Sequence, residues 1–271
     1  MSDGAPDFLS GDNGLVIGRR LTGRALARDA VDDALRRLTA EPLRLARAAA
    51  QGPRRSVLVL AVEREDAPNL LVGARTELMR SRHAVSFHHI GVGTAGKFEN
   101  LDRLLEAHPA VGHDWLLVID DDVVLPDGFL DRFLFLAERF GLRLAQPAHR
   151  ARSHAAWTVT RRRRASVVRE TAYVEIGPVS AFHADTFSTL LPFPPLRAGW
   201  GLDAHWAAVA AQRGWPLGVI DATAIRHGLR QIAAAYDRDA AIAEGHAYLA
   251  GRPYLRAEQA NRTLRVHRSW R

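Results

Sequence analysis

The stretch WLLVIDDDVVLP, residues 115–126, decides the expected fold. Residues 115–119 form a continuous apolar run, which is typical of a buried strand in an α/β sheet. The run ends in three acids, Asp120, Asp121 and Asp122. Open α/β sheets bind their ligands just outside the carboxyl ends of the strands, so we expect these acids at a ligand site.

Three adjacent carboxylates repel one another unless a cation neutralises them, and Mg²⁺ and Mn²⁺ prefer carboxylate oxygens. On an extended backbone the side chains of Asp120 and Asp122 point to one side and that of Asp121 to the other. The pattern therefore predicts a metal site shared by Asp120 and Asp122. An acidic turn before a helix that starts near Pro126-Asp127-Gly128 is the alternative, and a motif match alone does not exclude it.

The surrounding sequence alternates between strand-like and helix-like periods. Strands are predicted at 56–62, 85–92, 115–120, 143–146, 171–176, 178–183 and 215–220, and helices at 66–79, 98–107, 127–140, 204–213 and 232–249. Asp66 is the expected N-cap of the first of these helices. Strict alternation over the first half predicts an α/β fold with a mainly parallel, Rossmann-type sheet and helices on both faces.

The regions outside this alternation differ in composition. We expect disorder over 1–14, a helical segment over 15–53 and one catalytic-type domain over 54–271, which includes the C-terminal helix. The apolar positions of the N-terminal helices are predicted to be Leu35, Leu38, Leu43 and Leu45. Residues 150–164 are expected to form an inserted hairpin or a mobile flap.

Composition limits the chemistry. The chain has 271 residues, of which 47% are hydrophobic, which is enough for one full core. It has no cysteine, so disulfides, thiolate nucleophiles and cysteine-based metal sites are excluded, and any metal must bind Asp, Glu or His. No signal peptide and no apolar run of roughly 20 residues is present, which predicts a cytoplasmic protein without a transmembrane segment.

The formal charge of +7 suggests an anionic partner, but 30 acids are interspersed with the 37 basic residues. All basic residues except Lys97 are arginine, a residue suited to bidentate phosphate binding. The run Arg161–Arg164 is interpreted either as a solvated charge cluster or, with Arg226, as a clamp for a diphosphate or an anionic acceptor.

Three further motifs each allow a structural and a functional interpretation. The loop 91–97 (GVGTAGK) is either a plain strand-to-helix turn or a phosphate-binding loop, and it lacks a P-loop pattern. In Gly199-Trp200-Gly201-Leu202-Asp203 the acid is either a helix N-cap or a functional carboxylate, with two glycines that permit close approach and an indole that offers a stacking face. His227 follows the last strand region and is either structural or a metal ligand.

Taken together, these motifs resemble those of family 2-type glycosyltransferases with the GT-A fold. Glu63-Arg64-Glu65-Asp66 occupies the position where such enzymes grip the nucleotide, Asp120-Asp121-Asp122 resembles their Asp-x-Asp metal motif, and residues 199–203 resemble their Trp-Gly-x-(Glu)-Asp element. The resemblance covers about residues 55–228. It implies an inverting transfer of a sugar from a nucleoside-diphosphate donor to an acceptor hydroxyl.

The resemblance also implies roles for individual residues. Mn²⁺ or Mg²⁺ would bind Asp120, Asp122 and His227, and Asp203 would be the catalytic base. Glu63, Arg64, Lys97, Asp120 and Asp121 would contact the donor, and Trp200 and Gly201 the acceptor, which is a glycan, a lipid-linked molecule or a small molecule. Leu202 stands where many members carry glutamate, and the Gln-x-x-Arg-Trp element of processive synthases is absent, so polymer synthesis is not expected.

Other functional classes remain as alternatives. A nucleotidyltransferase would use a similar sheet but commonly carries a glycine- and basic-rich loop after its first strand, which residues 63–69 do not resemble. A phosphotransferase with an aspartyl nucleophile would need a hydroxyl motif after Asp122, and none is present. An arginine-rich nucleic-acid-binding or interaction protein on a degenerate enzyme core is the third alternative, although its basic runs lack interleaved aromatics.

Overall fold

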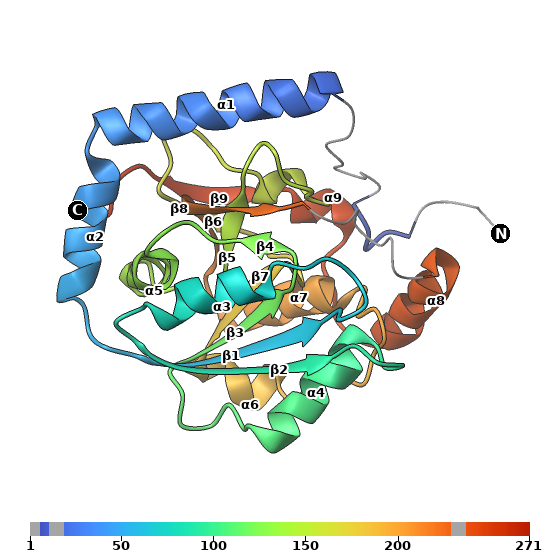
Figure 1. Ribbon diagram of the computed structural model, residues 1–271. Coiled ribbons are helices and arrows are strands. Elements are labelled where there is room, and N and C mark those ends of the chain that lie inside the picture. The colour runs from blue at the N-terminus through green and yellow to red at the C-terminus, as the bar shows by residue number, and fades with distance from the viewer. Residues whose placement is uncertain (1–5, 11–18, 229–236) are drawn as a thin grey trace.

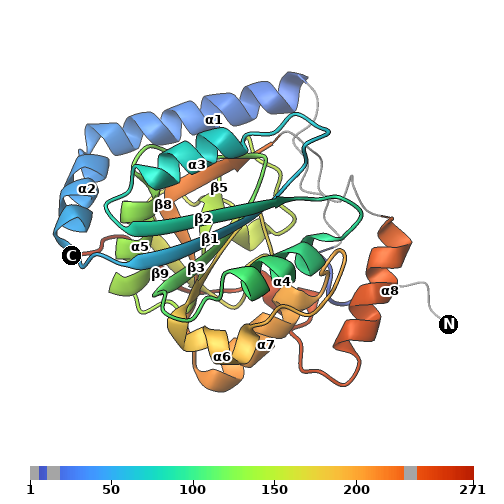
Figure 2. The same ribbon diagram turned by 60° about the horizontal axis from the view of Figure 1, so that its bottom comes forward.

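The computed structural model of the chain describes residues 6–10, 19–228 and 237–271. A single mixed sheet crosses the centre of the molecule, with helices on both of its faces (Figures 1 and 2). The strands are β1 (Ser56–Glu63), β2 (Ala84–Gly91), β3 (Trp115–Asp120), β4 (Val123–Val124), β5 (Leu144–His149), β6 (Val168–Thr171), β7 (Val179–His183), β8 (Leu217–His227) and β9 (Thr263–His267).

The helices surround this sheet. They are α1 (Arg19–Leu38), α2 (Glu41–Gln51), α3 (Leu71–Met79), α4 (Lys97–Ala107), α5 (Phe129–Arg139), α6 (Phe187–Leu190), α7 (Leu202–Arg213), α8 (Arg238–Leu249) and α9 (Ala257–Ala260), with the 3₁₀ turns η1 (Thr158–Thr160) and η2 (Ala184–Thr186). Among the residues that the structure describes, no helix combines the length and the apolar character that a membrane span requires.

The strand order is β2-β1-β3-β7-β5-β8-β6-β9, and β4 pairs with β8 beside this path. The strands β2, β1, β3, β5, β8 and β9 run in one direction, whereas β7 and β6 run against their neighbours. The predicted α/β class with a mainly parallel sheet and helices on both faces is therefore confirmed. Strand β7 lies between β3 and β5 and runs antiparallel to both. The sequence predicted this strand but not its direction.

The central strands are apolar on both sides because each side is covered by helices. In β1, Val57, Val59 and Ala61 pack on the face covered by α2, α3 and α5, whereas Leu58 and Leu60 pack on the face covered by α4, α6 and α7. Strand β3 alternates in the same way. A continuous apolar run is the expected sequence of such a strand, which explains why β1 and β3 were predicted within one or two residues.

The parallel register brings the polar ends of the strands to one edge. Val62 of β1 pairs with Asp120 of β3, and Glu63 pairs with Gly91 of β2. The acids at 120–122, the residues after β1 and the loop before α4 are therefore neighbours. This edge holds the candidate site.

Several predicted boundaries are wrong. The helix expected at 66–79 begins only at Leu71, so Asp66 is not its N-cap; Pro68 disfavours helical geometry at the residue before it, and the Leu70 amide donates to the Asp121 carbonyl (2.6 Å). The strand expected at 171–176 is instead β6, which ends at Thr171. Strand β8 continues past the expected end at 220 to His227 because it pairs with β4 there.

The N-terminal region also differs from expectation. Residues 6–10 form a turn in which Phe8 is buried against Ala204 and Leu249, rather than a disordered tail. Residues 1–5 and 11–14 of the segment predicted to be disordered lie outside the described residues, as do residues 232–236 of the predicted C-terminal helix. Of the four leucines predicted as apolar core positions, only Leu45 is buried.

Candidate active site

Three candidate metal ligands meet at the carboxyl edge of the sheet. Asp120 ends β3, Asp122 lies two residues further on, and His227 is the last residue of β8. One ligand atom from each side chain lies within 4.8 Å of the other two. Strand β8 reaches this edge because Val123 of β4 pairs with His227. The sequence predicted all three residues, and the fold brings them together.

Asp122 and His227 form a buried pair. The Asp122 Oδ1 and His227 Nε2 atoms are 3.0 Å apart, and the two side chains are 4% and 14% exposed. Burial alone lowers the pKa of His227, but the hydrogen bond and the negative charge of Asp122 outweigh it, and the pKa lies above its ordinary value. The imidazole therefore lies in a negative environment, which would also favour a bound cation.

Lys97, the first residue of α4, neutralises Asp120. Its Nζ lies 2.6 Å from Asp120 Oδ1 and donates to the Ile176 carbonyl at 3.2 Å. Gly177 leaves the space for this pair, since a Cβ there would lie 2.9 Å from both Asp120 Oδ2 and Lys97 Nζ. The loop at 91–97 joins β2 to α4, and its lysine reaches the acidic edge.

Asp121 has a different contact from Asp120 and Asp122, as predicted, although β3 ends at Asp120 and residues 121 and 122 form a turn. Its Oδ2 accepts from the Arg64 amide at 2.7 Å. Glu63, at the end of β1, contacts His89 Nδ1 at 3.0 Å and accepts from Asn69. Asp121 therefore ties the segment after β1 to the acidic triplet, which fixes the position of the residues predicted to contact the donor.

Asp203 lies in the first turn of α7 and is 7% exposed. Burial raises the pKa of its carboxyl to about 7, against the opposing hydrogen bond from the Ala204 amide at 2.9 Å. The buried Tyr173 is its neighbour, and burial together with the charge of Asp203 raises the pKa of that phenol. The N-cap of α7 is Gly201, so Asp203, the second residue of the helix, is not its N-cap. A buried carboxyl group with a pKa near neutrality is a candidate functional group.

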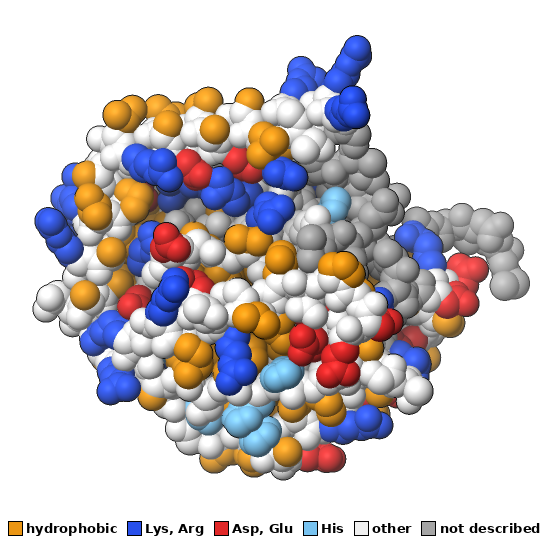
Figure 3. Space-filling model, viewed as in Figure 1, with side chains coloured by type: hydrophobic (Ala, Val, Ile, Leu, Met, Phe, Trp, Pro, Cys, Tyr) orange, Lys and Arg blue, Asp and Glu red, His pale blue; other side chains and the backbone are white. Residues whose placement is uncertain are grey.

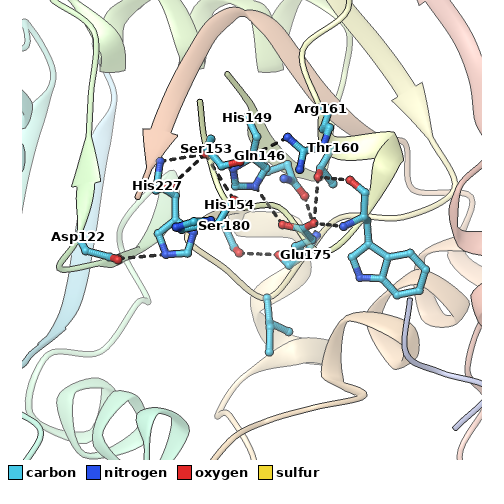
Figure 4. A network of polar contacts seen from close by, with 12 residues as sticks. Asp122, Gln146, His149, Ser153, His154, Thr160, Arg161, Glu175, Ser180 and His227 are labelled. Carbon is cyan, nitrogen blue, oxygen red and sulfur yellow. Dashed lines mark hydrogen bonds and ion pairs between the residues drawn. The ribbon is translucent and has the colours of Figure 1, made fainter. Parts of the chain in front are cut away.

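Glu175 lies between Asp203 and the metal-ligand cluster, and sequence reasoning missed it. Its negative charge contributes to the raised pKa values of both Asp203 and His227. The Glu175 carboxylate accepts from the Trp157 amide and the Thr160 hydroxyl, each at 2.9 Å. Figure 4 shows these contacts converging on Glu175.

His149 connects this carboxylate to His227. Its Nε2 lies 3.0 Å from Glu175 Oε2, and its Nδ1 lies 3.0 Å from the Ser153 hydroxyl (Figure 4). Ser153 Oγ in turn accepts from the His227 amide at 2.9 Å. The network therefore fixes the backbone of His227 and joins β5, β8 and the segment before β7. The one sequence signal for a role of Glu175 is that it is an acid within an otherwise apolar, strand-like run.

The run Arg161–Arg164 is partly solvated, since Arg163 and Arg164 are exposed, but it also contacts α1 and β8. Arg162 pairs with Asp33 of α1 (2.9 Å), Arg164 pairs with Asp32 of α1, and the Arg163 amide donates to Asp221 (2.8 Å). Segment 150–164 contains the short turn η1 in place of a hairpin. Arg226 alternates with His227 along β8 and so faces away from the cluster.

The two residues predicted to contact the acceptor precede Asp203. Trp200 packs with Phe8 and Leu249, and the Arg238 guanidinium lies 5.9 Å from its ring centre. Gly201 has φ 92°, and a Cβ there would lie 2.9 Å from Leu249. Packing alone thus accounts for the glycine.

No protein-family model matches the chain, and a search of curated proteins found no match. Solved structures are similar in fold. One is a mannosyltransferase from Pyrobaculum calidifontis in complex with GDP-Man and Mn²⁺, with 16% identity and a TM-score of 0.44; the match covers 73% of this chain and 65% of the mannosyltransferase, which is less than two thirds of its length.

Two further structures show the same level of similarity. Glucosyl-3-phosphoglycerate synthase from Mycobacterium tuberculosis, in complex with Mn²⁺, UDP and phosphoglyceric acid, has 14% identity and a TM-score of 0.47, with 76% of this chain and 80% of that chain covered. GalNAc-T7 with UDP, GalNAc and Mn²⁺ has 11% identity and a TM-score of 0.47, with 66% and 45% covered.

Proposed function

We propose that the chain is a metal-dependent glycosyltransferase of the family 2 type, which moves a sugar from a nucleoside-diphosphate donor to an acceptor hydroxyl with inversion at the anomeric carbon. The observation that carries this proposal is that a candidate metal site and a separate buried carboxyl group lie near the same edge of the sheet. Asp120, Asp122 and His227 can hold a divalent cation, and Asp203, across Glu175, has a pKa of about 7.

The donor atoms fit a divalent cation. Two carboxylates and one imidazole suit Mn²⁺ better than Mg²⁺, because Mg²⁺ strongly prefers oxygen ligands, whereas first-row transition metals accept nitrogen. A bound Mn²⁺ would stabilise negative charge on the departing diphosphate as a Lewis acid. Ser153 would hold the His227 backbone in place, since its hydroxyl bonds to the His227 amide.

The donor is proposed to bind over the ends of β1 and β3. Lys97 holds Asp120 in one orientation and adds a positive charge beside the diphosphate position. Asp121 fixes the Arg64 amide, and through it the segment after β1 that would face the nucleoside, with Glu63 at its start. The side chains of Lys97, Asp120 and Asp121 are held by these contacts, so they need little further ordering when a donor binds.

Asp203 is proposed as the base that removes the acceptor proton. A carboxyl group with a pKa near the working pH combines a useful ionised fraction with a useful basicity. The acceptor would lie over the start of α7, beside Trp200 and Gly201, and its oxygen would attack the anomeric carbon from the face opposite the diphosphate. The buried Glu175 disfavours the ionised form of Asp203 and so strengthens it as a base.

The first test is a thermal-shift measurement with nucleoside diphosphates and nucleotide sugars, with and without Mn²⁺. A ligand that binds the folded chain raises the melting temperature. We expect a Mn²⁺-dependent rise for one nucleotide class. Asp122→Asn should abolish the rise. The matched control is Asp127→Asn, which removes a charge from an exposed residue of the same loop and should leave the rise unchanged.

The outcome that would refute the proposal is equally concrete. If no nucleotide raises the melting temperature with Mn²⁺, or if Asp122→Asn and Asp127→Asn respond alike, the donor site does not exist. Where a donor is found, NMR of the product made with an identified acceptor gives the anomeric configuration, and retention of configuration would exclude the single-base mechanism.

A further inference from the structure

Helix α1 packs on the molecule with its charged side. Asp29 accepts from the amides of Ala151 and Arg152 at 2.8 and 2.9 Å, and Asp29 and Asp32 are each only 5% exposed. Asp33 pairs with Arg150 and Arg162. The inner side of α1 therefore packs through hydrogen bonds and ion pairs, in contrast to a surface helix of ordinary amphipathic design, which buries its apolar side.

Several large apolar side chains of this region are exposed. Six large apolar residues of α1 and the start of α2 are between 44% and 82% exposed: Leu21, Leu26, Val31, Leu35, Leu38 and Leu43. Figure 3 shows hydrophobic side chains along the edge of the molecule formed by α1. At about 100° per residue, Val31, Leu35 and Leu38 fall within an arc of about 60°, whereas Leu21 borders a pocket between α1 and residues 149–162. Val31, Leu35 and Leu38 form one apolar stripe. We use the name outer face for this stripe together with the exposed arginines of α1.

The charges of the outer face have one sign. Arg19, Arg20, Arg24, Arg28 and Arg37 of α1 are exposed. Arg20 and Arg24 fall on the same arc as the apolar stripe, whereas Arg28 lies beside it, and Arg24 and Arg28 also line a pocket between α1 and residues 149–162. The acids of α1 are the inward-facing Asp29, Asp32 and Asp33, and Glu41 of α2 is partly buried beside Arg36. Within the described part of α1 and α2, no exposed carboxylate offsets these arginines.

We propose that the outer face binds the surface of an anionic lipid bilayer, with α1 lying in the plane of the interface. Exposed leucine and valine would enter the boundary between headgroups and acyl chains, and the arginines would contact lipid phosphates. Helix α1, at roughly 30 Å, is long enough to make this contact along the whole edge of the molecule.

Other occupants fit less well. A second copy of the chain would bring the same arginines against each other across a twofold axis, where they would repel. Nucleic acid would neutralise the arginines but leave the apolar stripe in water, since phosphate contacts dominate such binding. An anionic bilayer accommodates both features, and binding to it is independent of the proposed catalytic function.

The test is flotation of the full chain with vesicles of phosphatidylcholine, with and without phosphatidylglycerol. We expect binding only to the anionic vesicles and weakening by salt. Leu35→Ser/Leu38→Ser and Arg20→Gln/Arg24→Gln should each reduce partitioning by about tenfold or more, since two interfacial arginines alone contribute about that factor. All four residues are exposed, so the variants should keep the wild-type melting temperature.

The controls make equal changes elsewhere. Met79→Ser/Val111→Ser removes two exposed apolar side chains, and Arg103→Gln/Arg213→Gln removes two exposed arginines of α4 and α7. Both should bind as the wild type does. The proposal is overturned if the chain does not float, if it floats equally with neutral vesicles, or if the controls lose as much binding. It is also overturned if Leu35→Ser/Leu38→Ser abolishes a dimer seen by sedimentation, or if the arginines alone drive DNA binding.

Discussion

Asp203 carries the clearest consequence at the scale of a single residue. Its pKa of about 7, which burial raises from 3.8, applies to the folded chain only. Between about pH 4 and pH 7 the folded state therefore holds a proton that the unfolded state releases. Stability should fall as pH rises through this window, by up to about 1.4 kcal/mol per pH unit, and level off above it.

Asp203→Asn should remove this contribution, so that the variant loses less stability than the wild type between about pH 5 and pH 8. Urea unfolding of both proteins at the two pH values measures this difference in the free energy of unfolding. In the proposed reaction, kcat/KM of the wild type should rise with pH to a plateau above about pH 7, because only the ionised carboxylate accepts a proton. Parallel stability profiles for wild type and Asp203→Asn would show that the carboxyl titrates normally.

Gly177 allows the pair of Lys97 and Asp120 to form. A Cβ at 177 would overlap Asp120 Oδ2 and Lys97 Nζ, each at 2.9 Å, so we expect Gly177→Ala to displace Asp120. Isothermal titration with Mn²⁺ should then give an affinity lower by about tenfold, which corresponds to about 1.4 kcal/mol. Gly73→Ala, where the new methyl group meets no neighbour, is the control and should bind Mn²⁺ normally. Equal affinities in both variants would contradict the proposed role of Asp120.

Among the secondary-structure elements, β6 and β8 are joined by an ion pair that is wholly buried. Arg169 Nε lies 2.8 Å from Asp221 Oδ2, and both side chains are 0% exposed. Arg169 also donates to the carbonyls of Val159 and Arg161. We expect Asp221→Ala to cost about 3–5 kcal/mol, because it leaves a buried guanidinium unpaired.

A double-mutant cycle with Arg169→Met separates the pair from its surroundings. In urea unfolding, the double variant should lose less stability than the sum of the two single variants, since no isolated charge remains. The pair of Arg143 and Asp185, whose atoms are 2.7 Å apart and whose side chains are 32% and 51% exposed, is the more exposed comparison and should show a coupling of about 1 kcal/mol or less. A buried pair that couples no more strongly than this exposed one would refute the expectation.

The elements that the sequence predicts well are those with local signals. The strand at 115–120 and its acids are recognisable because burial on both faces demands an apolar run and the metal ligands follow it directly. Glu175 and His149 were missed because their contact spans 26 residues and depends on the pairing of β5 with β7 and β8. His227 was found only as the end of a strand region, since its pairing with β4 has no sequence signal.

The prediction that Leu35 and Leu38 are core positions of α1 is wrong for a related reason. Periodicity places leucines toward the core, yet Leu35 and Leu38 are exposed, and Asp32 is buried. The partner of Asp32 is Arg164, which lies 132 residues away. A helix that packs by ion pairs on an arginine-rich segment cannot be recognised until the fold brings that segment beside it.

For the molecule as a whole, α1 and α5 should respond differently to salt. Ion pairs hold α1, whereas α5 buries Phe129, Phe133 and Leu134 in the main core. Raising the ionic strength to about 1 M shortens the Debye length to about 3 Å and weakens the partly exposed ion pairs. Hydrogen exchange followed by mass spectrometry should show faster exchange in α1 and unchanged exchange in α5. Equal responses would mean that α1 is not held by its charges.

Lys97 is the single lysine of the chain, and it lies at the candidate site, 15% exposed and paired with Asp120. An acylating reagent that attacks amines therefore has one side-chain target in the whole protein, apart from the terminal amine. The yield of that one adduct, read by mass spectrometry, would report whether the site is open or filled. The chain thus carries an intrinsic chemical probe of ligand occupancy, available without any engineered label.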